Sequence, residues 1–430
     1  MTGLRRSGKT VFITSLIHHL MDAIDLPFVR AVHDQRYRGA RLTEDQGKNA
    51  FPIAEFLRDL DATPPRWPKA TEELSTLEIE IAYETDNTIW RQFQTDWRLR
   101  LEIIDYPGEW LLDLPLLDTS FEEFCNDATL GLAFPSRRRL AAAWIERLNE
   151  LNLAGRPDLE GLETAISAYH HYATRCQSEL GMSFIQPGRL TSPGELEGSS
   201  LLRFCPVLPE GLGDNWITVE LKKRYDRYRD RVVLPFYEKQ FRFFDRQIVL
   251  VDLLSNLNSG PEYFEDTKRA LERILKSFRY GRRTLLDRLF APSIDRVLFA
   301  VSKADHIASN QHPNLKQLLE LLVRPRIQEL KFHGLDHDVL ALAALRSTDV
   351  VRTEHDGQML SCVRGRLRDE DRETILFPGE VPPELPEPQD WLSGRFRFRE
   401  FAPRRLVPGK KAQHIRLDQA IEYLIGDKLI

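Results

Sequence analysis

The chain has 430 residues, of which 42% are hydrophobic and 29% charged, with a net charge of −5 at pH 7. This suits one large domain or two ordinary ones. Acidic and basic residues are interspersed, which excludes the basic footprint of a nucleic-acid-binding protein. No apolar run approaches the roughly 18 residues of a membrane span, so we expect a cytoplasmic protein without direct membrane insertion. The four cysteines lie far apart and are expected to be buried, reduced thiols.

The N-terminus carries the most informative motif. Residues 3–10 read Gly-Leu-Arg-Arg-Ser-Gly-Lys-Thr, a complete G-x-x-x-x-G-K-[ST] phosphate-binding loop. The glycines let the backbone bend so that successive N–H groups face phosphate oxygens, and the positive end of the following helix adds to them. We expect Lys9 to reach the β- and γ-phosphates and the Thr10 hydroxyl to bind Mg²⁺. The residues predicted to bind the nucleotide here are Gly3, Ser7, Gly8, Lys9, Thr10 and Val11.

The placement of this loop is unusual. Such a loop follows a buried strand of about five or six residues. Only Met1 and Thr2 precede Gly3 in this sequence. We therefore expect the first strand to be missing or truncated, and the native chain to begin upstream of Met1.

The first hundred residues predict one helix and one pair of strands. Apolar residues at helical spacing predict a helix over 10–24. The polar stretch 26–70 is interpreted as a long, mobile and irregular connection. Residues 77–83 and 99–103 alternate between apolar and polar side chains on either side of a turn, which predicts two antiparallel strands.

The rest of the chain alternates between helical and strand patterns. Residues 118–240 are helical in character. The continuous apolar runs 247–252 and 296–301 are typical of strands buried on both faces of a sheet. A helix that begins near Pro261 and extends to about residue 278 separates them. Further elements are predicted as a helix at 315–331, a strand at 339–343, a hairpin at 356–357, a strand at 395–399 and a helix at 417–425.

A second motif ends the strand at 99–103. Asp105 follows this strand and opens the pattern D-x-x-G, which Gly108 completes. A carboxylate at a strand end can hold Mg²⁺ through water, and the Gly108 N–H can meet a γ-phosphate and so report its presence. Asp252 also ends an apolar strand and is the rival, but no glycine stands three residues later. We therefore predict Asp105 as the metal ligand.

A third motif follows the strand at 296–301, where residues 302–305 read Ser-Lys-Ala-Asp. This is similar to the guanine-specificity motif N-K-x-D. Asp305 would accept two hydrogen bonds from guanine N1 and N2, which adenine cannot supply, while the Lys303 stem would lie along the base. Ser302 replaces the usual Asn and lacks the amide that braces the loop. After the next strand, Leu345 occupies the position where a backbone N–H would contact the guanine carbonyl.

With these motifs, the chain resembles the YcjX family of bacterial stress-associated P-loop GTPases, which have a Ras-like core. The resemblance covers nearly the whole chain. It implies binding of GTP and GDP, Mg²⁺, slow hydrolysis and a helical insertion. It also implies a membrane-protein partner, through which the protein would be peripheral to the inner membrane. The segments outside the nucleotide motifs that carry the resemblance are 184–190, 243–252, 278–281, 294–300 and 414–418.

The sequence departs from small Ras-like GTPases at the residues expected to act in catalysis. Those proteins carry Gln directly after D-x-x-G to orient the attacking water, whereas this chain has Glu109. Arg5 stands inside the phosphate loop, where it would either supply charge in cis or lie on the surface and pair with a carboxylate of the insertion. A hydroxyl that completes the metal shell is assigned to Thr71, with Thr43 and Thr63 as competitors.

These observations predict an α/β fold: a Ras-like P-loop NTPase domain, a mostly parallel sheet flanked by helices. The domain is expected at 1–117 and 241–350, with a large helical insertion at 118–240 and a C-terminal extension at 351–430. The predicted function is Mg²⁺-dependent GTP binding with slow hydrolysis, used as a molecular switch. Two alternatives are a nucleotide-gated scaffold without significant turnover and an ATP-dependent P-loop phosphotransferase, which Asp305 disfavours.

Overall fold

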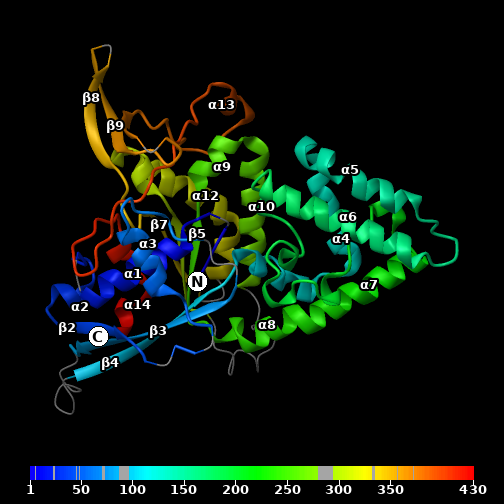
Figure 1. Cartoon of the computed structure of the whole chain (residues 1–430), viewed down its shortest axis with the longest axis horizontal. Helices are drawn as coiled ribbons and strands as arrows, with labels where there is room; N and C mark the ends of the chain where they lie inside the picture. The colour runs from blue at the N-terminus through cyan, green and yellow to red at the C-terminus, as the bar shows by residue number, and fades with distance from the viewer. Residues whose placement is uncertain are drawn as a thin grey trace. The chain divides into compact units, whose positions relative to one another are not determined.

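The chain forms two compact units, whose elements are labelled in Figure 1. The computed structural model describes residues 1–430 except positions 5, 23–24, 45, 48, 70–72, 87–95, 279–293, 332–334, 356 and 371. The sheet unit comprises Met1–Pro107, Arg246–Pro261 and Asp295–Ile430, and the helical unit comprises Gly108–Asp245 and Glu262–Ile294. The first boundary between the units therefore lies at residue 107 where the sequence suggested 117, and the segment 351–430 belongs to the sheet unit.

A parallel sheet forms the centre of the sheet unit, with strand order β1-β5-β6-β7. Leu250 of β5 pairs with Gly3 and with Ala300 of β6, so the carboxyl ends of these strands meet at one edge. The continuous apolar runs are buried, as predicted for strands covered on both faces. The strands are β1 (Thr2–Gly3), β5 (Arg246–Val251), β6 (Arg296–Val301) and β7 (Asp336–Ala341).

Helices pack against this sheet, and two of them, α1 and α14, share one hydrophobic core with it. Ile17 of α1 and Ile421 of α14 share that core with Leu250 of β5 and Leu298 of β6. The predicted helices are confirmed, because apolar residues at helical spacing face the sheet. A short helix directly after β5 was not predicted. The helices are α1 (Lys9–Asp22), α9 (Leu253–Ser259), α12 (His312–Lys331) and α14 (Leu417–Ile425).

A second, antiparallel sheet has the order β2-β3-β4. The predicted strand pair is confirmed, with Ile81 of β3 opposite Leu99 of β4. The prediction of an irregular connection over 26–70 is wrong, because this stretch holds two helices and a strand. Glycine and arginine hide the alternation of that strand, which is stabilised by pairing with β3. The elements are α2 (Arg30–His33), β2 (Tyr37–Leu42), α3 (Ile53–Asp61), β3 (Ser75–Glu84) and β4 (Asp96–Asp105).

A third sheet, in the order β10-β9-β8, is antiparallel and follows Thr348. The predicted hairpin is confirmed, with Gly357 at φ 75° in its turn. The predicted strand at 395–399 is wrong: the structure describes this whole stretch and assigns no strand to it. Its Phe398 N–H donates to the Asn258 side chain at 2.9 Å, so a side chain takes the place of a strand partner. The elements are β8 (Asp349–His355), β9 (Gln358–Arg366), β10 (Glu373–Leu376) and α13 (Pro388–Leu392).

The helical unit confirms the helical character predicted for this part of the chain. Ser120 and Glu123 form a capping box at the start of its first helix. Aromatic rings fill the interior; Phe124 stacks on Tyr225 with ring centroids 5.1 Å apart. None of the described helices has the length and apolar character needed to cross a bilayer. The helices are α4 (Phe121–Leu130), α5 (Pro135–Glu150), α6 (Leu159–Ser178), α7 (Trp216–Tyr228), α8 (Leu234–Lys239) and α10 (Pro261–Ser277).

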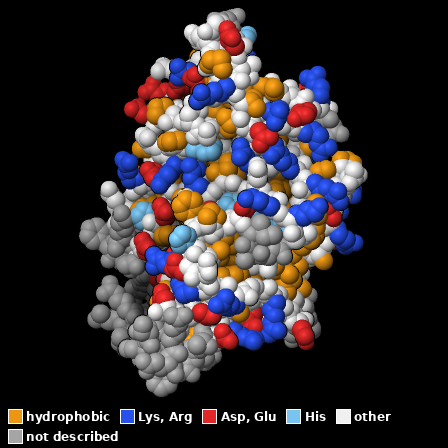
Figure 2. Space-filling view, turned by 90° about the vertical axis from the view of Figure 1, so that its left-hand side faces the viewer, with side chains coloured by type: hydrophobic (Ala, Val, Ile, Leu, Met, Phe, Trp, Pro, Cys, Tyr) orange, Lys and Arg blue, Asp and Glu red, His pale blue; other side chains and the backbone are white. Residues whose placement is uncertain are grey.

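Charges of both signs share the surface of the protein. On β3 and β4, Arg98 Nη1 lies 2.8 Å from Glu80 Oε1, and Arg100 pairs with Glu78. Figure 2 shows basic and acidic side chains mixed with hydrophobic ones on the face that it draws. Such exposed pairs contribute little stability each, and the mixing leaves no single-sign field on this face.

Candidate functional site

The phosphate-binding loop of the sequence connects β1 to the N-terminus of α1. The Leu4 N–H donates to Leu250 O at 3.1 Å, which ties the start of the loop to β5. The Ser7 N–H donates to Leu4 O at 3.1 Å and closes the turn. Arg6 and Gly8 have positive φ angles of 61° and 84°, which reverse the backbone just before the helix. The loop therefore ends at the first turn of a helix, where unpaired N–H groups can bind an anion.

Both motif glycines are required by the local geometry, for different reasons. A Cβ on Gly3 would lie 2.3 Å from Ser7 Oγ and 3.0 Å from Leu250 O, so only glycine fits between the loop and β5. A Cβ on Gly8 would meet nothing within 4 Å, but its φ favours glycine. Gly3 therefore closes the loop by tight packing, whereas Gly8 supplies a turn beside open space.

Lys9 and Asp105 meet beside this loop. The Lys9 ammonium donates to Tyr106 O at 3.0 Å and lies 3.9 Å from Asp105 Oδ1. Asp105 is 0% exposed, and among the described residues neither of its carboxylate oxygens has a hydrogen-bond partner. A buried carboxylate without donors is costly, and Lys9 compensates only part of its charge. The arrangement leaves two oxygens for a hydrated cation.

The neighbouring hydroxyl groups fit the same assignment. Thr10 lies in the first turn of α1 and is 7% exposed. The Ser7 Oγ is buried and has no hydrogen-bond partner in the described part of the chain. Mg²⁺ prefers carboxylate, hydroxyl and phosphate oxygens, so the donor set of Thr10 and Asp105 fits a magnesium–phosphate group.

Asp252, the rival metal ligand, is already bonded. Its Oδ1 accepts the Ser255 N–H at 3.0 Å and caps α9, and its Oδ2 lies 2.5 Å from the Lys303 ammonium. Burial alone would raise the pKa of Asp252, but Lys303 and the cap together hold that pKa below its ordinary value. Asp252 therefore acts as a helix cap and ion-pair partner, in contrast to Asp105.

Lys303 follows β6 in a left-handed conformation, at φ 60° and ψ 30°. Its ammonium also donates to Glu400 Oε1 at 3.1 Å. The Ser302 N–H before it donates to Val251 O at 3.0 Å and braces the strand end, although the Asn of the usual motif is absent. The backbone of this motif is thus fixed to β5, and its lysine is held by two carboxylates.

Asp305 is tied to the loop after β7. It is 4% exposed, and its Oδ2 accepts the Ser347 N–H at 2.7 Å. Thr348 Oγ1 donates to the Asp305 carbonyl oxygen. The Leu345 side chain is buried in a small cluster with Leu406, and within the described residues its N–H has no hydrogen-bond partner. The structure therefore brings the Lys-x-Asp turn together with the loop after β7, which contains Leu345.

Four predicted residues lie outside this arrangement. Arg5 and Thr71 are not among the described residues. Gly108 and Glu109 begin the helical unit, in the short helix Gly108–Leu112. Glu109 is buried, and its Oε1 accepts from Gln177 Nε2 at 3.4 Å. The competing Thr43 lies at the end of β2, where its hydroxyl accepts from Gln46 at 3.0 Å.

Two residues that contact the site were missed by sequence reasoning. Glu400 lies 97 residues after its partner Lys303, and its neighbouring arginines and phenylalanines suggested a strand instead. Ser347 contacts Asp305 through its backbone, which leaves no mark on the choice of side chain. Only the carboxylate of Glu400, in an otherwise basic stretch, offered a usable signal.

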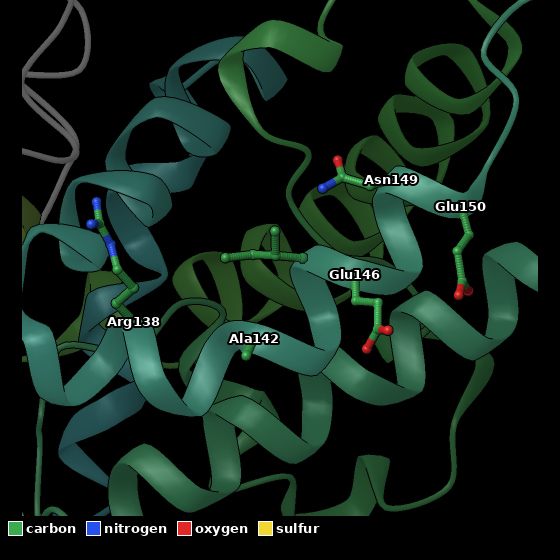
Figure 3. A pocket seen from close by; sticks show the side chains of 6 residues that line it. Arg138, Ala142, Glu146, Asn149 and Glu150 are labelled. Carbon is green, nitrogen blue, oxygen red and sulfur yellow. The ribbon is translucent and has the colours of Figure 1, made fainter.

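A surface groove on the helical unit contains none of the predicted site residues. It is lined by one face of α5, and Figure 3 shows Arg138 toward one end and Glu146 and Glu150 toward the other. The surface of the groove is mostly apolar, with side chains of both charges around it. It has no convergent set of buried polar groups of the kind that marks a ligand site.

The strand–loop–helix that holds Lys9, the buried Asp105 at a strand end and the Lys-x-Asp turn after β6 define a P-loop NTPase domain of the Ras-like type. The comparisons agree with this class. The chain belongs to the YcjX-like family, whose model matches residues 1–429. It is 37% identical to the Ras-like GTPase YcjX of Escherichia coli over 446 residues, covering 100% of this chain and 95% of that protein. The protein of the same name from Shewanella oneidensis is 36% identical over 457 residues, covering 100% and 94%.

Proposed function

We propose that the protein binds GTP and GDP together with Mg²⁺ and hydrolyses GTP slowly, as a stress-associated molecular switch. The observation that carries this proposal is the buried Asp105, whose unpartnered carboxylate lies beside Lys9 and the phosphate loop. The relatives' names, Ras-like GTPase, support the choice of nucleotide and reaction.

The residues of the sheet unit take distinct roles at the phosphates. Lys9 moves from the Tyr106 carbonyl to the β- and γ-phosphate oxygens, while the N–H groups of Gly8 and Val11 and the Ser7 hydroxyl surround them. Thr10 and Asp105 hold Mg²⁺, directly and through water. When bound, Mg²⁺ supplies positive charge to the oxygens around the bond that breaks. Thr71 is assigned to the metal shell in the GTP state only.

Base recognition is assigned to the Lys-x-Asp turn. Asp305 already accepts one N–H from Ser347, and its carboxylate retains acceptor capacity for guanine N1 and N2. Ser302 braces the turn, Lys303 lies beside the base, and the Leu345 N–H donates to the guanine carbonyl. This pattern favours guanine over adenine, because adenine offers an acceptor where guanine N1 donates.

For the chemical step we propose Glu109 as the group that orients the attacking water, with Arg5 as a source of positive charge in cis. A carboxylate brings negative charge toward a triphosphate, so turnover by the isolated protein should be slow, on the order of 10⁻⁴–10⁻² s⁻¹. The contact between Glu109 and Gln177 at 3.4 Å favours a second candidate function, in which that carboxylate is structural and the protein is a nucleotide-gated scaffold without turnover.

Competition binding with a fluorescent GDP tests the proposal. GTP should displace the probe at least tenfold better than ATP, and EDTA should weaken GTP binding. Lys9→Ala should abolish binding. In Asp305→Asn, a donor replaces an acceptor, which should cost about 2–4 kcal/mol of GTP binding and let xanthosine triphosphate recover part of it. Equal affinity for GTP and ATP in the parent protein would refute the guanine assignment. Multiple-turnover phosphate release separates the switch from the scaffold.

A further inference from the structure

The charge partners of Lys303 come from two distant parts of the sheet unit. Its ammonium lies 2.5 Å from Asp252 Oδ2, at the end of β5, and 3.1 Å from Glu400 Oε1, near the end of the extension. Glu400 Oε2 in turn accepts from Arg368 Nη1 at 2.8 Å. The side chain of Lys303 is 21% exposed, so two carboxylates hold a mostly buried ammonium in one position. A turn with a left-handed lysine is thereby linked to the C-terminal segment.

The segment that contains Glu400 is hydrogen-bonded to Gln311, which follows the Lys-x-Asp turn, and to α9, which follows β5. We call residues 379–401 the strap. The Gln311 amide, just beyond the turn, donates to Gly379 O at 2.8 Å and accepts the Val381 N–H at 2.7 Å. Trp391 Nε1 donates to Leu257 O at 2.8 Å in α9, and α13 is seen beside α9 in Figure 1. These bonds fix the strap over the segments that follow β5 and β6.

The strap also contacts the turn directly at its end. The ring of Phe401 meets His306 edge-on, with centroids 5.1 Å apart. His306 directly follows Asp305, and its N–H donates to Lys303 O at 2.9 Å. A non-glycine residue in the left-handed region is disfavoured, because its Cβ crowds the backbone. The contacts at Lys303 and His306 therefore stabilise a turn that its own sequence does not favour.

We propose that Glu400 is a positioning residue for guanine recognition, and that the strap holds the base-reading turn in its binding conformation. This inference rests on the proposed function of Asp305. Glu400 fixes the Lys303 ammonium, so the lysine stem keeps the position in which it lies along the base. The Asp305 carboxylate, two residues later, is thereby held facing guanine N1 and N2. Glu400 itself touches neither the base nor the phosphates.

The charge of Glu400 and its positioning of Lys303 affect nucleotide affinity in opposite directions, which can be tested. Burial would raise the pKa of Glu400, but Lys303 outweighs that effect and holds the pKa below its ordinary value, so Glu400 is ionised at neutral pH. Removing its negative charge would strengthen binding of every anionic nucleotide through the field alone. Losing the position of Lys303 would instead weaken guanine nucleotides and leave adenine nucleotides unchanged. The two effects have opposite signs.

Titration of the full chain with fluorescent GDP, and competition by GTP and ATP, distinguishes them. Glu400→Gln should weaken GDP and GTP binding about fivefold and reduce the preference for GTP over ATP by the same factor. Glu400→Asp keeps the charge and should recover most of that loss. If the effect acts through Lys303, then Lys303→Met should also lose affinity, and adding Glu400→Gln to it should cause no further loss.

A matched control is Glu179→Gln, because Glu179 also accepts from an arginine, Arg175 Nε at 2.6 Å, but on an exposed surface of the helical unit, outside the strap. It should leave binding unchanged. Parental affinity and base preference in Glu400→Gln, tighter binding of all nucleotides, or additive losses in the double variant would each overturn the role of Glu400. Failure of the proposed function looks different: the parent protein itself would then show no preference for guanine nucleotides.

Discussion

Two buried carboxylates, Asp105 of the sheet unit and Asp266 of the helical unit, have opposite surroundings. In the sheet unit, Asp105 is fully buried, and neither of its oxygens has a hydrogen-bond partner among the described residues. In the helical unit, Asp266 accepts from Arg137 and from the N–H groups of Ser183 and Phe184, at 2.6 and 3.0 Å. The same chemical group is left open in one unit and saturated in the other.

Asp113 repeats the second pattern. Its carboxylate accepts the Gly188 N–H at 2.7 Å, the Arg189 N–H at 3.2 Å and the Tyr228 hydroxyl at 2.6 Å. Saturated carboxylates such as this one fix irregular loops, since the side chain replaces a missing strand or helix partner. An open carboxylate stabilises nothing by itself. The difference separates a buried acid that holds the fold together from one that the described residues leave without donors.

The largest expected effect comes from breaking a saturated site. Asp266→Ala leaves the Arg137 guanidinium, 6% exposed, without its counter-charge, and leaves two N–H groups without acceptors. We expect the helical unit to lose about 3–5 kcal/mol of stability. Hydrogen exchange of the α5 and α10 amides measures this unit separately, because a chain of two units need not unfold in one step.

An exposed ion pair on α5, the helix that carries Arg137, serves as the control. Arg147 and Glu150 are 2.7 Å apart and about half exposed, at 47% and 53%. Glu150→Gln should leave the exchange rates of these amides nearly unchanged, because an exposed pair contributes little. Equal effects of Asp266→Ala and Glu150→Gln would contradict the view that saturation of Asp266 stabilises the unit.

The next effect concerns pH. Burial raises the pKa of Asp113 from 3.8 to about 6, even though three donors oppose that shift. Between pH 4 and 6 the folded state therefore binds this proton more tightly than the unfolded state does. Its contribution to stability is full below pH 4 and is lost as the pH rises through 6, by an amount on the order of 3 kcal/mol. Asp113→Asn should abolish this slope.

The informative measurement is the difference between parent and variant in the free energy of unfolding of the helical unit, from pH 4 to 7. Subtraction removes the carboxylates that both proteins share. The stability of the parent relative to Asp113→Asn should fall as the pH rises. A difference that stays constant over this range would show that Asp113 titrates normally.

Most regular elements could be predicted because local patterns specified them. The apolar runs of β5 and β6, the spacing in α1 and α14 and the alternation in β3 each carry their own signal. The predictions for β2 and for the stretch 395–399 were wrong for opposite reasons. β2 owes its structure to pairing with β3, whereas the second stretch alternates like a strand but bonds to the side chain of Asn258. Long-range partners of this kind leave no periodicity to read.

The site was predictable as far as its motifs reach. The phosphate loop, Asp105 and Asp305 were predicted from spacing alone, and the structure places Asp105 beside Lys9. Their binding roles stay predictions. The preference for Asp105 over Asp252 is now supported by their partners, which no spacing reveals. Glu400 was missed because its relation to Lys303 spans 97 residues and has no motif. The assignments of Arg5 and Thr71 stay predictions.

A smaller effect tests the open carboxylate directly. Asp105→Asn removes a buried charge that lacks donors, and it should therefore raise the stability of the sheet unit by about 1 kcal/mol in buffer without metal or nucleotide. The same change should weaken Mg²⁺-dependent GTP binding at least tenfold. The opposite changes in stability and binding are the signature of a ligand site, measured by thermal unfolding and by nucleotide titration with and without EDTA.

Asp252→Asn is the matched control, because it neutralises a buried strand-end aspartate that already has partners. It should lower stability, since Lys303 and Ser255 lose a charged acceptor. If Asp105→Asn also lowers stability, the carboxylate is structural like Asp252, and the contrast between open and saturated sites fails.

The smallest effect is expected at Glu109, a buried carboxylate intermediate between the open Asp105 and the saturated Asp266. It belongs to the helical unit by its contacts, yet it follows D-x-x-G in the sequence. Its one described side-chain partner, Gln177 at 3.4 Å, is a weak one, so the carboxylate is neither saturated nor open. Glu109→Ala should slow GTP turnover about threefold, or ~0.7 kcal/mol, because a carboxylate is a poor substitute for Gln in placing water.

GDP affinity should stay within about twofold in the same variant, since a group that touches only the water does not bind the product. Gln177→Ala provides the comparison: it removes the partner and keeps the carboxylate, so turnover should be retained or rise. If Glu109→Ala hydrolyses GTP as fast as the parent and both variants lose equal stability, Glu109 is a structural acid of the helical unit. The attacking water must then be placed by another group.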